Sequence, residues 1–444
     1  MIFLISLSSH ADLHKVSLQL KWKHQFQFAG YYMALEKGFY KQVGLEVEIK
    51  EAKLGINLVD EVLNGHSTYA VGRTNSLIDI SQGKKIVYLA AIYQSSPLVL
   101  MALQSANIKK ITDIRDLRIM LTGDKEIDAV LIAMMLSQGI NYSDIQLQAH
   151  SYNINDLIQH KTDLMTAYIS NEPFLLREKG IKSILFHPKN YGFDFYNDLL
   201  FTSQQTIDKD PEQVRNFKAA SLEGWKYAFD HIEETVAIIL NKYNSQNKSR
   251  AAYIFEANEL KKLAYYHTDQ LGKIERKTLE KTYEIYKILG LAKGDINLDK
   301  AIYQKTDNEL NLNYQELKYL QAKKVINMCV DPDWLPFTHL KNGDYTGISA
   351  DIYKLIKEEL PIPLKVIETQ SWSQTITFAK ARKCDIIDFA IKTSEREVYL
   401  NFTEPFLKVP LVIATRHEVP FIANFKSLQE QKLALLKTML LLTY

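Results

Sequence analysis

The stretch LQLKWKHQFQFAGYY, residues 18–32, contains the strand-to-helix transition on which the fold prediction rests. Apolar and polar residues alternate over 16–20, as in a half-buried strand, and 30–40 has the spacing of a helix. The same change of period then repeats, with expected strands at 45–49, 68–71 and 86–91 and expected helices at 55–64 and 76–81. Strands and helices in turn, with short connections, predict βαβ units and a mainly parallel sheet.

A second α/β set follows from about residue 114. Its expected strands are 117–121, 145–149 and 164–168, and its expected helices are 125–138, 154–160 and 173–179. Two such sets joined by an extended crossing segment predict two doubly wound lobes with a cleft between them. Ligands in open α/β sheets bind outside the carboxyl ends of the strands, where loops and helix starts meet.

The rest of the chain adds helices and a third lobe. Long amphipathic helices are expected over 211–289, packed on the outside of the lobes, and the charge-dense run 307–324 reads as a helical connector. From residue 325 a further α/β lobe is expected, with strands 325–330, 364–367 and 385–390 and helices 350–359 and 374–380. We therefore divide the chain into 1–15, 16–303, 304–324 and 325–444.

Composition excludes several classes of function. The 444 residues carry 54 basic and 52 acidic side chains, a net charge of +2 that argues against nucleic acid as a partner. The sequence shows no phosphate-binding loop and no His spacing typical of a metal site. Its two cysteines, Cys329 and Cys384, are too few for a disulfide framework or a cysteine-based zinc site, and we expect them to be buried small hydrophobic residues.

The N-terminus bears on the compartment. Residues 2–7 form a short apolar run, and small residues follow at 9–11, as at a signal-peptide cleavage site. The basic start of a signal peptide is missing, so a buried first strand is the alternative. We favour a signal-peptide remnant over residues 1–15, because 12–15 is polar and a better strand begins at Val16. This predicts a periplasmic or secreted protein of a bacterium.

Several motifs in residues 16–300 resemble a known family. The stretch 18–32 is joined by EKGFY at 36–40, GLEV at 44–47, YAVGRTNS at 69–76 and NEPF at 171–174. Together they resemble the family that links thiamine pyrimidine synthases to bacterial sulfonate- and hydroxymethylpyrimidine-binding proteins. The resemblance implies an α/β fold of the type II periplasmic binding protein class, in which a cleft between two lobes captures a small planar or anionic ligand.

The third lobe resembles a different family, the extracellular solute-binding proteins of the polar amino-acid type (family 3). The matching motifs are DPDWLPF at 331–337, GISAD at 347–351, TSER at 393–396 and FTEPF at 402–406. They cover only the first lobe of that family, so we expect a truncated domain whose tail over 424–444 is poorly ordered or loosely docked. A strand is expected at 411–414, and Phe402, Phe406 and Val409 lie where the missing lobe would pack.

Tandems of these two modules resemble the periplasmic sensor regions of bacterial receptors. The resemblance implies a small-molecule ligand as the first partner. It also implies either the membrane component of an ABC transporter or a lost, membrane-anchored output domain. Transport and sensing both remain open from the sequence.

Candidate ligand-binding residues of the first module follow its strands. Trp22 follows the first strand, and Phe28 and Tyr31 at the next helix start are expected to face the same mouth. Asn75 and Ser76 follow a strand and open a helix, where free backbone N–H groups converge. Two further candidates are Glu172, which could pair with a ring amine, and Tyr196 of the crossing segment.

Three candidates lie in the third lobe. Arg396 is the residue that the family 3 resemblance assigns to a ligand carboxylate, which a guanidinium binds through two hydrogen bonds. Asp333 and Trp334 would line the same mouth. Ala390 and Lys392 stand where the family often has small hydroxyl residues, which argues against amino-acid specificity. Because the motifs cover only one lobe, we expect residues 325–444 to bind amino acids weakly or not at all.

The first resemblance also implies an alternative, an enzyme. Thiamine pyrimidine synthases make hydroxymethylpyrimidine phosphate from pyridoxal phosphate, held on a lysine, and a histidine, with iron at a cysteine-rich motif. The corresponding segment here, VGRTNSL at 71–77, has neither Lys nor His, and no Cys precedes Cys329. A Schiff base needs a primary amine, which Arg73 lacks. We expect binding without a cofactor, metal or catalytic residue, and keep the synthase as the alternative.

Overall fold

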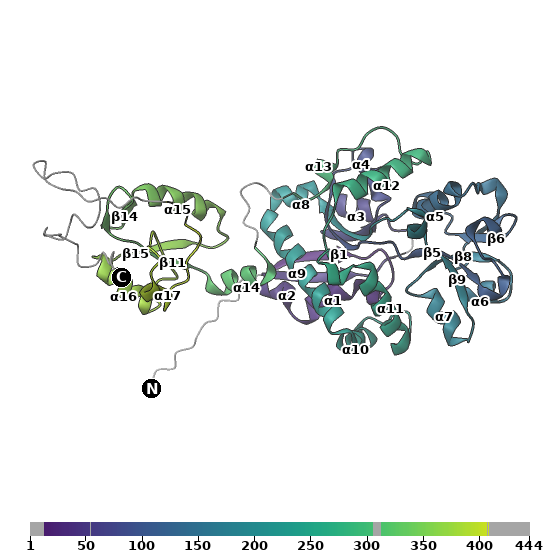
Figure 1. Ribbon diagram of the computed structural model, residues 1–444, viewed down its shortest axis with the longest axis horizontal. Helices are drawn as coiled ribbons and strands as arrows, with labels where there is room; N and C mark the ends of the chain where they lie inside the picture. Colours follow the sequence, from purple (N-terminus) through teal and green to yellow (C-terminus); the bar gives the residue numbers. More distant parts are fainter. Residues whose placement is uncertain (1–12, 54, 305–311, 406, 408–444) are drawn as a thin grey trace, which may run out of the picture. The chain divides into compact units, whose positions relative to one another are not determined.

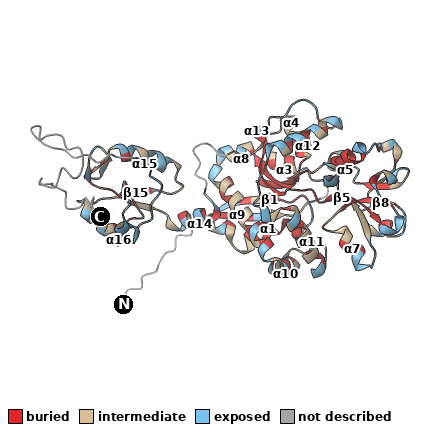
Figure 2. Ribbon diagram, viewed as in Figure 1, coloured by how far each residue is buried: buried red, intermediate tan, exposed pale blue. Residues whose placement is uncertain are grey.

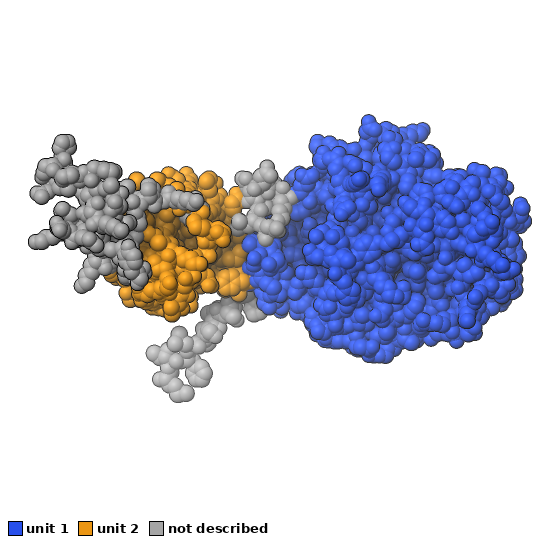
Figure 3. Space-filling view, viewed as in Figure 1, with its two compact units in different colours: residues 1–307, 311–318 blue, residues 308–310, 319–444 orange. Residues whose placement is uncertain are grey.

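The computed structural model describes residues 13–53, 55–304, 312–405 and 407, and it divides into two compact units (Figures 1 and 3). Unit 1 contains residues 1–307 and 311–318, and unit 2 contains residues 308–310 and 319–444. Among the described residues, no helix has both the length and the apolar character that a membrane crossing requires.

The first lobe of unit 1 is built on a five-stranded sheet in the order β2-β1-β3-β10-β4. β1 runs parallel to β2 and β3, whereas β10 runs antiparallel to β3 and β4. The strands are β1 His14–Gln19, β2 Leu45–Lys50, β3 Tyr69–Arg73, β4 Ile86–Tyr93 and β10 Asn197–Ser203, and the helices are α1 Ala29–Glu36, α2 Phe39–Gln42, α3 Leu58–Leu63 and α4 Ser76–Ser81.

The second lobe repeats this plan with the order β7-β6-β8-β5-β9. β6 runs parallel to β7 and β8, and β5 runs antiparallel to β8 and β9. Its strands are β5 Leu98–Leu103, β6 Arg118–Leu121, β7 Gln146–Ala149, β8 Leu164–Tyr168 and β9 Ser183–Phe186, and its helices are α5 Lys125–Ser137, α6 Ile154–Ile158 and α7 Glu172–Glu178.

The prediction of mainly parallel sheets is confirmed, because four of the five described strands in each lobe run in the same direction. The fifth strand, β10 in the first lobe and β5 in the second, is antiparallel and comes from the connection with the other lobe. The chain leaves the first lobe after β4 to form β5, and it returns after β9 to form β10. A strand that returns from the opposite direction pairs antiparallel with its new neighbours. β4 and β5 are buried along their whole lengths, and Figure 2 shows buried residues concentrated in the sheets.

Amphipathic helices cover the outside of unit 1, as predicted. The longest, α9, crosses α1 so closely that a Cβ on Gly224 would lie 2.1 Å from the Gly30 carbonyl oxygen. The Trp225 ring fills the space beside Gly30 and is fully buried. The helices are α8 Gln204–Lys209, α9 Pro211–Asp230, α10 Ile232–Lys242, α11 Arg250–Leu263, α12 Arg276–Ile288 and α13 Leu298–Ala301, with 3₁₀ helices at Phe26–Phe28, Gln104–Ala106, Ile111–Ile114, Tyr142–Asp144, Pro188–Tyr191 and Tyr266–Thr268.

Unit 2 is a small α/β lobe, in agreement with the predicted third lobe. A parallel sheet in the order β15-β11-β16 lies beside a hairpin sheet in the order β12-β13-β14, which the sequence did not predict. Its elements are β11 Ile326–Cys329, β12 Asp333–Trp334, β13 Thr338–Lys341, β14 Asp344–Thr346, α15 Ile348–Glu359, β15 Leu364–Ile367, α16 Trp372–Lys380, β16 Ile386–Ile387 and α17 Ser394–Glu397. The helix α14 Tyr314–Lys323 has its first residues in unit 1 and its last residues in unit 2. Phe406, Val409, the strand predicted at 411–414 and the tail over 424–444 lie outside the described residues.

The two cysteines form a disulfide, so the prediction of free, buried thiols is wrong. Cys329 ends β11 and Cys384 precedes β16, with their Cα atoms 5.7 Å apart. β11 pairs directly with β16, and this pairing brings the two thiols together although 55 residues separate them in sequence. Disulfides are typical of oxidising compartments.

Reduction of this disulfide should destabilise unit 2 by about 4 kcal/mol, because the cross-link closes a long loop and restricts the unfolded chain. Urea unfolding of the full chain with and without dithiothreitol measures the difference. The double variant Cys329→Ala/Cys384→Ala is the control and should be insensitive to the reductant. Alkylation of two free thiols in the unreduced, folded protein would show that no bond forms.

Candidate functional site

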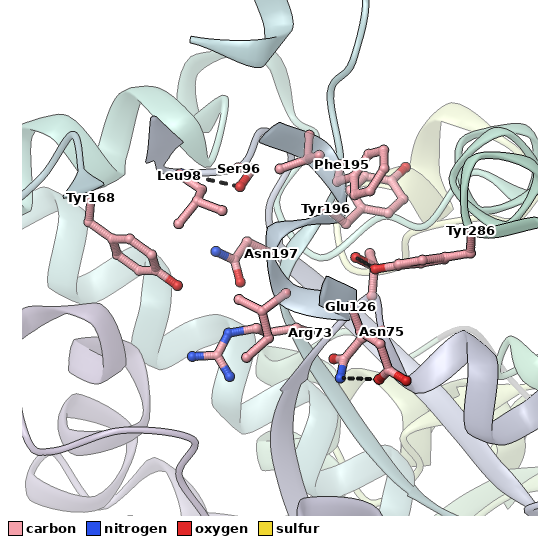
Figure 4. A pocket seen from close by; sticks show the side chains of 13 residues that line it. Arg73, Asn75, Ser96, Leu98, Glu126, Tyr168, Phe195, Tyr196, Asn197 and Tyr286 are labelled. Carbon is pink, nitrogen blue, oxygen red and sulfur yellow. Dashed lines mark hydrogen bonds between the residues drawn. The ribbon is translucent and has the colours of Figure 1, made fainter. Parts of the chain in front are cut away.

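A pocket lies where the two lobes and both crossing segments of unit 1 meet (Figure 4). It contains about 360 Å³ of space, counting the part open to solvent. The residues that line it are Arg73, Thr74, Asn75, Ser96, Leu98, Glu126, Ile127, Val130, Tyr168, Phe195, Tyr196, Asn197 and Tyr286.

The fold explains why these residues meet. Arg73 ends β3 of the first lobe and Tyr168 ends β8 of the second, so the carboxyl ends of two parallel strands face the pocket. Ser96 lies on the outgoing crossing segment, and Tyr196 lies on the returning one. Glu126 comes from the first turn of α5. The pocket is therefore assembled from both lobes, as expected for a cleft between them.

A buried ion pair supports the floor of the pocket. Lys21 Nζ lies 2.5 Å from Asp198 Oδ1, and both side chains are completely buried. Burial lowers the pKa of Lys21 and raises the pKa of Asp198, and in each case the opposite charge counteracts the effect. Lys21 also donates a hydrogen bond to Asn197 Oδ1 at the pocket wall. Gln27 Nε2 donates to both Asp198 oxygens, at 2.8 and 3.1 Å.

Arg73 and Tyr168 form the cationic side of the pocket. Burial alone would raise the pKa of the Tyr168 phenol, but the charges of Lys21 and Arg73 outweigh it, so the pKa is lowered. The Nε of Arg73 is buried and makes no hydrogen bond with the described residues. Because Asp198 neutralises Lys21, Arg73 supplies the excess positive charge at this side.

A carboxylate lies on the other side of the pocket. Glu126 Oε2 accepts a hydrogen bond of 3.4 Å from Asn75 Nδ2, which joins the first lobe to α5 of the second. Burial raises the pKa of Glu126. Behind them, the hydroxyls of Thr74 and Tyr286 are hydrogen bonded at 3.1 Å and tie β3 to α12. The pocket thus has donors on one side and an acceptor on the other.

The structure brings two of the seven predicted residues of the first module, Asn75 and Tyr196, into the pocket wall. Ser76 is buried beside it, where its hydroxyl donates to the Arg73 carbonyl and bonds the Tyr88 hydroxyl. The Glu172 carboxylate accepts from the Tyr168 backbone N–H at 2.7 Å. Ser76 and Glu172 therefore support the ends of β3 and β8 rather than line the pocket.

The predicted aromatic mouth is not present, because two of its three rings lie in the core. Phe28 and Tyr31 are fully buried, and Tyr31 packs edge-on against Trp225 at 5.8 Å. Trp22 is 40% exposed and pairs at 6.1 Å with Tyr152 of the second lobe, outside the pocket lining. These two rings are buried in the core that α9 covers, instead of facing the cleft. Ligand contact by these three residues stays a prediction.

Sequence reasoning missed the charged residues of the site. From the sequence, Arg73 is identified only as a residue without the amine of a Schiff base, and Lys21, Asp198 and Tyr168 have no predicted role. One signal was available: Asp198 stands directly before the apolar run Leu199-Leu200-Phe201, where an isolated charge implies a partner.

The candidates of unit 2 lie on α17 and β12. Arg396 Nη1 donates to the Ile391 carbonyl at 2.8 Å, and its guanidinium lies 5.3 Å from the centre of the Trp372 ring. Asp333 is exposed beside His339, whereas Trp334 is half-buried and packs against Phe337 at 5.0 Å. Ligand binding by these three residues stays a prediction.

Comparison with known families separates the chain into two modules. Residues 25–235 match the family described as NMT1/THI5 like, and residues 326–440 match the bacterial extracellular solute-binding proteins, family 3. Both predicted resemblances are confirmed.

Two curated relatives of the first module are named as binding proteins. The riboflavin-binding protein RibY of Chloroflexus aurantiacus is 26% identical over 227 residues, which are 49% of this chain and 63% of the relative. The chain thus spans less than two thirds of that relative. The formylaminopyrimidine-binding protein of Halalkalibacterium halodurans is 20% identical over 244 residues, 54% of this chain and 74% of the relative.

Solved structures support the fold. The periplasmic aliphatic sulphonate binding protein SsuA of Escherichia coli has a TM-score of 0.52 and 11% identity, with 66% of this chain and 92% of that chain covered. The alkanesulfonate-binding protein SsuA of Xanthomonas axonopodis pv. citri has a TM-score of 0.51 and 10% identity, with 66% and 100% covered. The predicted two-lobed binding-protein fold is confirmed.

The residues present do not fit pyridoxal phosphate. Arg73 lies in the pocket at the segment where the synthase resemblance expects a lysine, and a guanidinium forms no Schiff base. Lys21 is near the pocket, but its amine is buried in the ion pair with Asp198. Among the described residues, no group of three or more His, Cys, Asp or Glu side chains could hold a metal ion, and both cysteines are in the disulfide.

Breaking the buried pair from one side should be costly. Lys21→Met should lower the free energy of unfolding by about 3–5 kcal/mol, because Asp198 is left buried without its cation. Adding Asp198→Asn should restore most of this loss, since no charge then remains. Arg118→Gln, which breaks the more exposed pair with Asp163, is the control and should cost far less, because water screens that pair. If urea unfolding shows that the free-energy costs of Lys21→Met and Asp198→Asn simply add, the two side chains are not coupled and the prediction is wrong.

Proposed function

We propose that this chain, which joins an NMT1/THI5-like domain to a family 3 solute-binding domain, captures a small planar solute between the two lobes of unit 1. The observation that carries the proposal is the aromatic wall of the pocket. Tyr168, Phe195, Tyr196 and Tyr286 all line it, and they come from the second lobe, the returning crossing segment and α12.

The chemistry of the pocket suits a planar ring. Aromatic side chains favour offset or edge-on contact with other π-systems, and such contacts add to the energy of apolar burial. Pockets for small molecules are commonly about 300–1,000 Å³ and combine apolar walls with a few placed polar groups. The space that a water-sized sphere can enter here is only about 30 Å³, so the lobes must separate to admit a ring.

The relatives support the same ligand class. One is named for riboflavin and another for formylaminopyrimidine, and both of these solutes contain a planar nitrogen heterocycle. The sulfonate-binding structures share only the fold at their level of identity. A planar heterocycle is therefore a better-supported ligand than a sulfonate.

Capture would hold the lobes together. Both lobes and both crossing segments supply lining residues, so a ligand can contact all four only when the lobes are closed. A ligand that binds the closed form better than the open form shifts the population toward closure. A closed, loaded form is what a membrane transporter component or a receptor output domain would recognise.

We place this activity in the periplasm or outside the cell. The disulfide of unit 2 supports that location, because disulfides persist in oxidising compartments. The partner that recognises the loaded form is either an ABC transporter membrane component or a membrane-anchored output domain.

Binding of planar heterocycles should be measurable and should depend on the aromatic wall. Riboflavin and hydroxymethylpyrimidine are suitable probes for calorimetric titration of the full chain. Phe195→Leu keeps an apolar side chain but removes a π-face, so it should weaken the bound probe about threefold to tenfold. Phe174→Leu removes a ring outside this pocket and should leave the affinity unchanged. Equal effects of the two substitutions, or no binding of any planar heterocycle, would contradict the proposal.

The synthase alternative makes a different prediction. Incubation with pyridoxal phosphate should give no Schiff-base absorbance band and no lysine adduct after borohydride treatment, because Arg73 stands where an amine is needed. Lys21→Met is the control that reports any reaction at the buried amine. A borohydride-fixed adduct that disappears in Lys21→Met would favour the enzyme.

A further inference from the structure

We propose that Arg73, Asn197 and Tyr168 form a row of hydrogen-bond donors that reads oxygen acceptors on one edge of the ligand. The substrate class is then a planar heterocycle whose edge carries carbonyl or anionic oxygens, in preference to one whose edge carries an amine. This inference rests on the proposed function and deepens it by naming the chemistry of the recognised edge.

The orientation of Asn197 is decided by its neighbours. Its Oδ1 accepts a hydrogen bond from Lys21 Nζ and another of 2.9 Å from the Asp198 backbone N–H. An ammonium group and a backbone N–H can only donate, so the oxygen of the amide must face them. The NH₂ group of Asn197 therefore faces the pocket, where it donates one hydrogen bond to the Tyr168 oxygen and keeps a second N–H for a ligand. Figure 4 shows the side chain between Tyr168 and Arg73.

Arg73 can offer nothing but donors and carries the uncompensated charge. A guanidinium has five N–H donors and no acceptor. The charge of Lys21 is taken up by Asp198 at 2.5 Å, whereas Arg73 forms no ion pair of that kind with the described residues. The Tyr168 oxygen accepts one hydrogen bond from this guanidinium, and an oxygen-rich ligand edge would supply further acceptors, including one for the buried Nε of Arg73.

Tyr168 completes the row. Its phenol lies close enough to the charges of Lys21 and Arg73 for them to lower its pKa against the effect of burial. A phenol oxygen that faces cations and an amide N–H accepts from them, which leaves its own O–H to donate. In Figure 4 the hydroxyl of Tyr168 points into the space beside Asn197 and Arg73.

The opposite side of the pocket has the opposite character. The Glu126 carboxylate accepts from Asn75 and has further lone pairs for a ligand N–H or hydroxyl. Figure 4 shows Asn75 and Glu126 together, apart from Tyr168 and Asn197. The pocket is thus directional, and a ligand amine belongs at Glu126 rather than at the donor row.

Lys21 and Asp198 act as positioning residues in this arrangement. They do not line the pocket, but they fix the amide of Asn197 and are themselves held by Gln27. Gln27 is anchored in turn, because its backbone N–H donates to Glu256 Oε1 of α11 at 2.9 Å. The donor row therefore depends on a continuous buried network that runs from the pocket to α11.

Uracil, cytosine and orotate test the inference by calorimetric titration or competition. They share one ring, and cytosine replaces a carbonyl by an amine, while orotate adds a carboxylate. We expect uracil to bind at least tenfold more tightly than cytosine. Tighter binding of orotate than of uracil would identify an anionic edge, and the reverse order would identify a neutral dicarbonyl edge; both are forms of the proposed class.

Variants separate recognition from folding. Arg73→Gln should reduce the affinity for uracil and orotate at least tenfold and that for cytosine much less, and Arg73→Lys should partly rescue orotate. Arg118→Gln removes a guanidinium of the second lobe outside the pocket and should change none of the affinities. The double variant Lys21→Met/Asp198→Asn avoids an unpaired buried charge. It should lower the uracil-to-cytosine preference, because the Asn197 amide loses the Lys21 hydrogen bond and is held only by the backbone N–H of residue 198.

The outcomes distinguish this inference from the proposed function. Cytosine binding as tightly as uracil and orotate, or an unchanged preference in Arg73→Gln, would overturn the inference alone. The inference alone would also be overturned if none of these three compounds binds, but riboflavin or another planar heterocycle binds with an affinity that Arg73→Gln does not change. Failure of every planar heterocycle to bind would overturn the proposed function and this inference together.

Discussion

The ion pair between Lys21 and Asp198 is the interaction on which the site depends. Lys21 follows β1, and Asp198 lies in β10, the strand that returns from the second lobe. The pair therefore joins the first strand of this sheet in sequence to its last strand in sequence. Two charges without solvent are costly to bury and must be satisfied by each other and by further hydrogen bonds. Gln27 and Asn197 supply those bonds, and their side chains are oriented as a result.

Local pattern was enough to predict the parallel part of the fold but not the strands that cross between lobes. Each βαβ unit is encoded within about 30 residues, where the change of period is visible. β5 is a continuous apolar run, LVLMAL, that could equally be part of a buried helix, and β10 contains Asp198 among its first residues. Both strands are specified by neighbours on distant segments, which a local pattern does not contain.

The candidate site was predicted in part for the same reason. Asn75 was found because the carboxyl end of a strand is readable from sequence, and Tyr196 because it stands in the crossing segment. Phe28 and Tyr31 were misplaced, because only the packing of α9 on α1 decides whether a ring at a helix start faces a cleft or the core. The Cys329–Cys384 bond likewise depends on the pairing of β11 with β16.

Arg73 shows how one residue type can separate capture from catalysis on a shared fold, since function resides in the site rather than in the architecture. An amine at the end of β3 could attack a carbonyl and form a covalent intermediate. A guanidinium at that place stays protonated and is a poor nucleophile, but its fixed fork of donors holds oxygen atoms in a defined geometry. The side chain that is useless for a Schiff base is therefore well suited to reversible recognition, which a solute-binding protein requires because it must release what it captures.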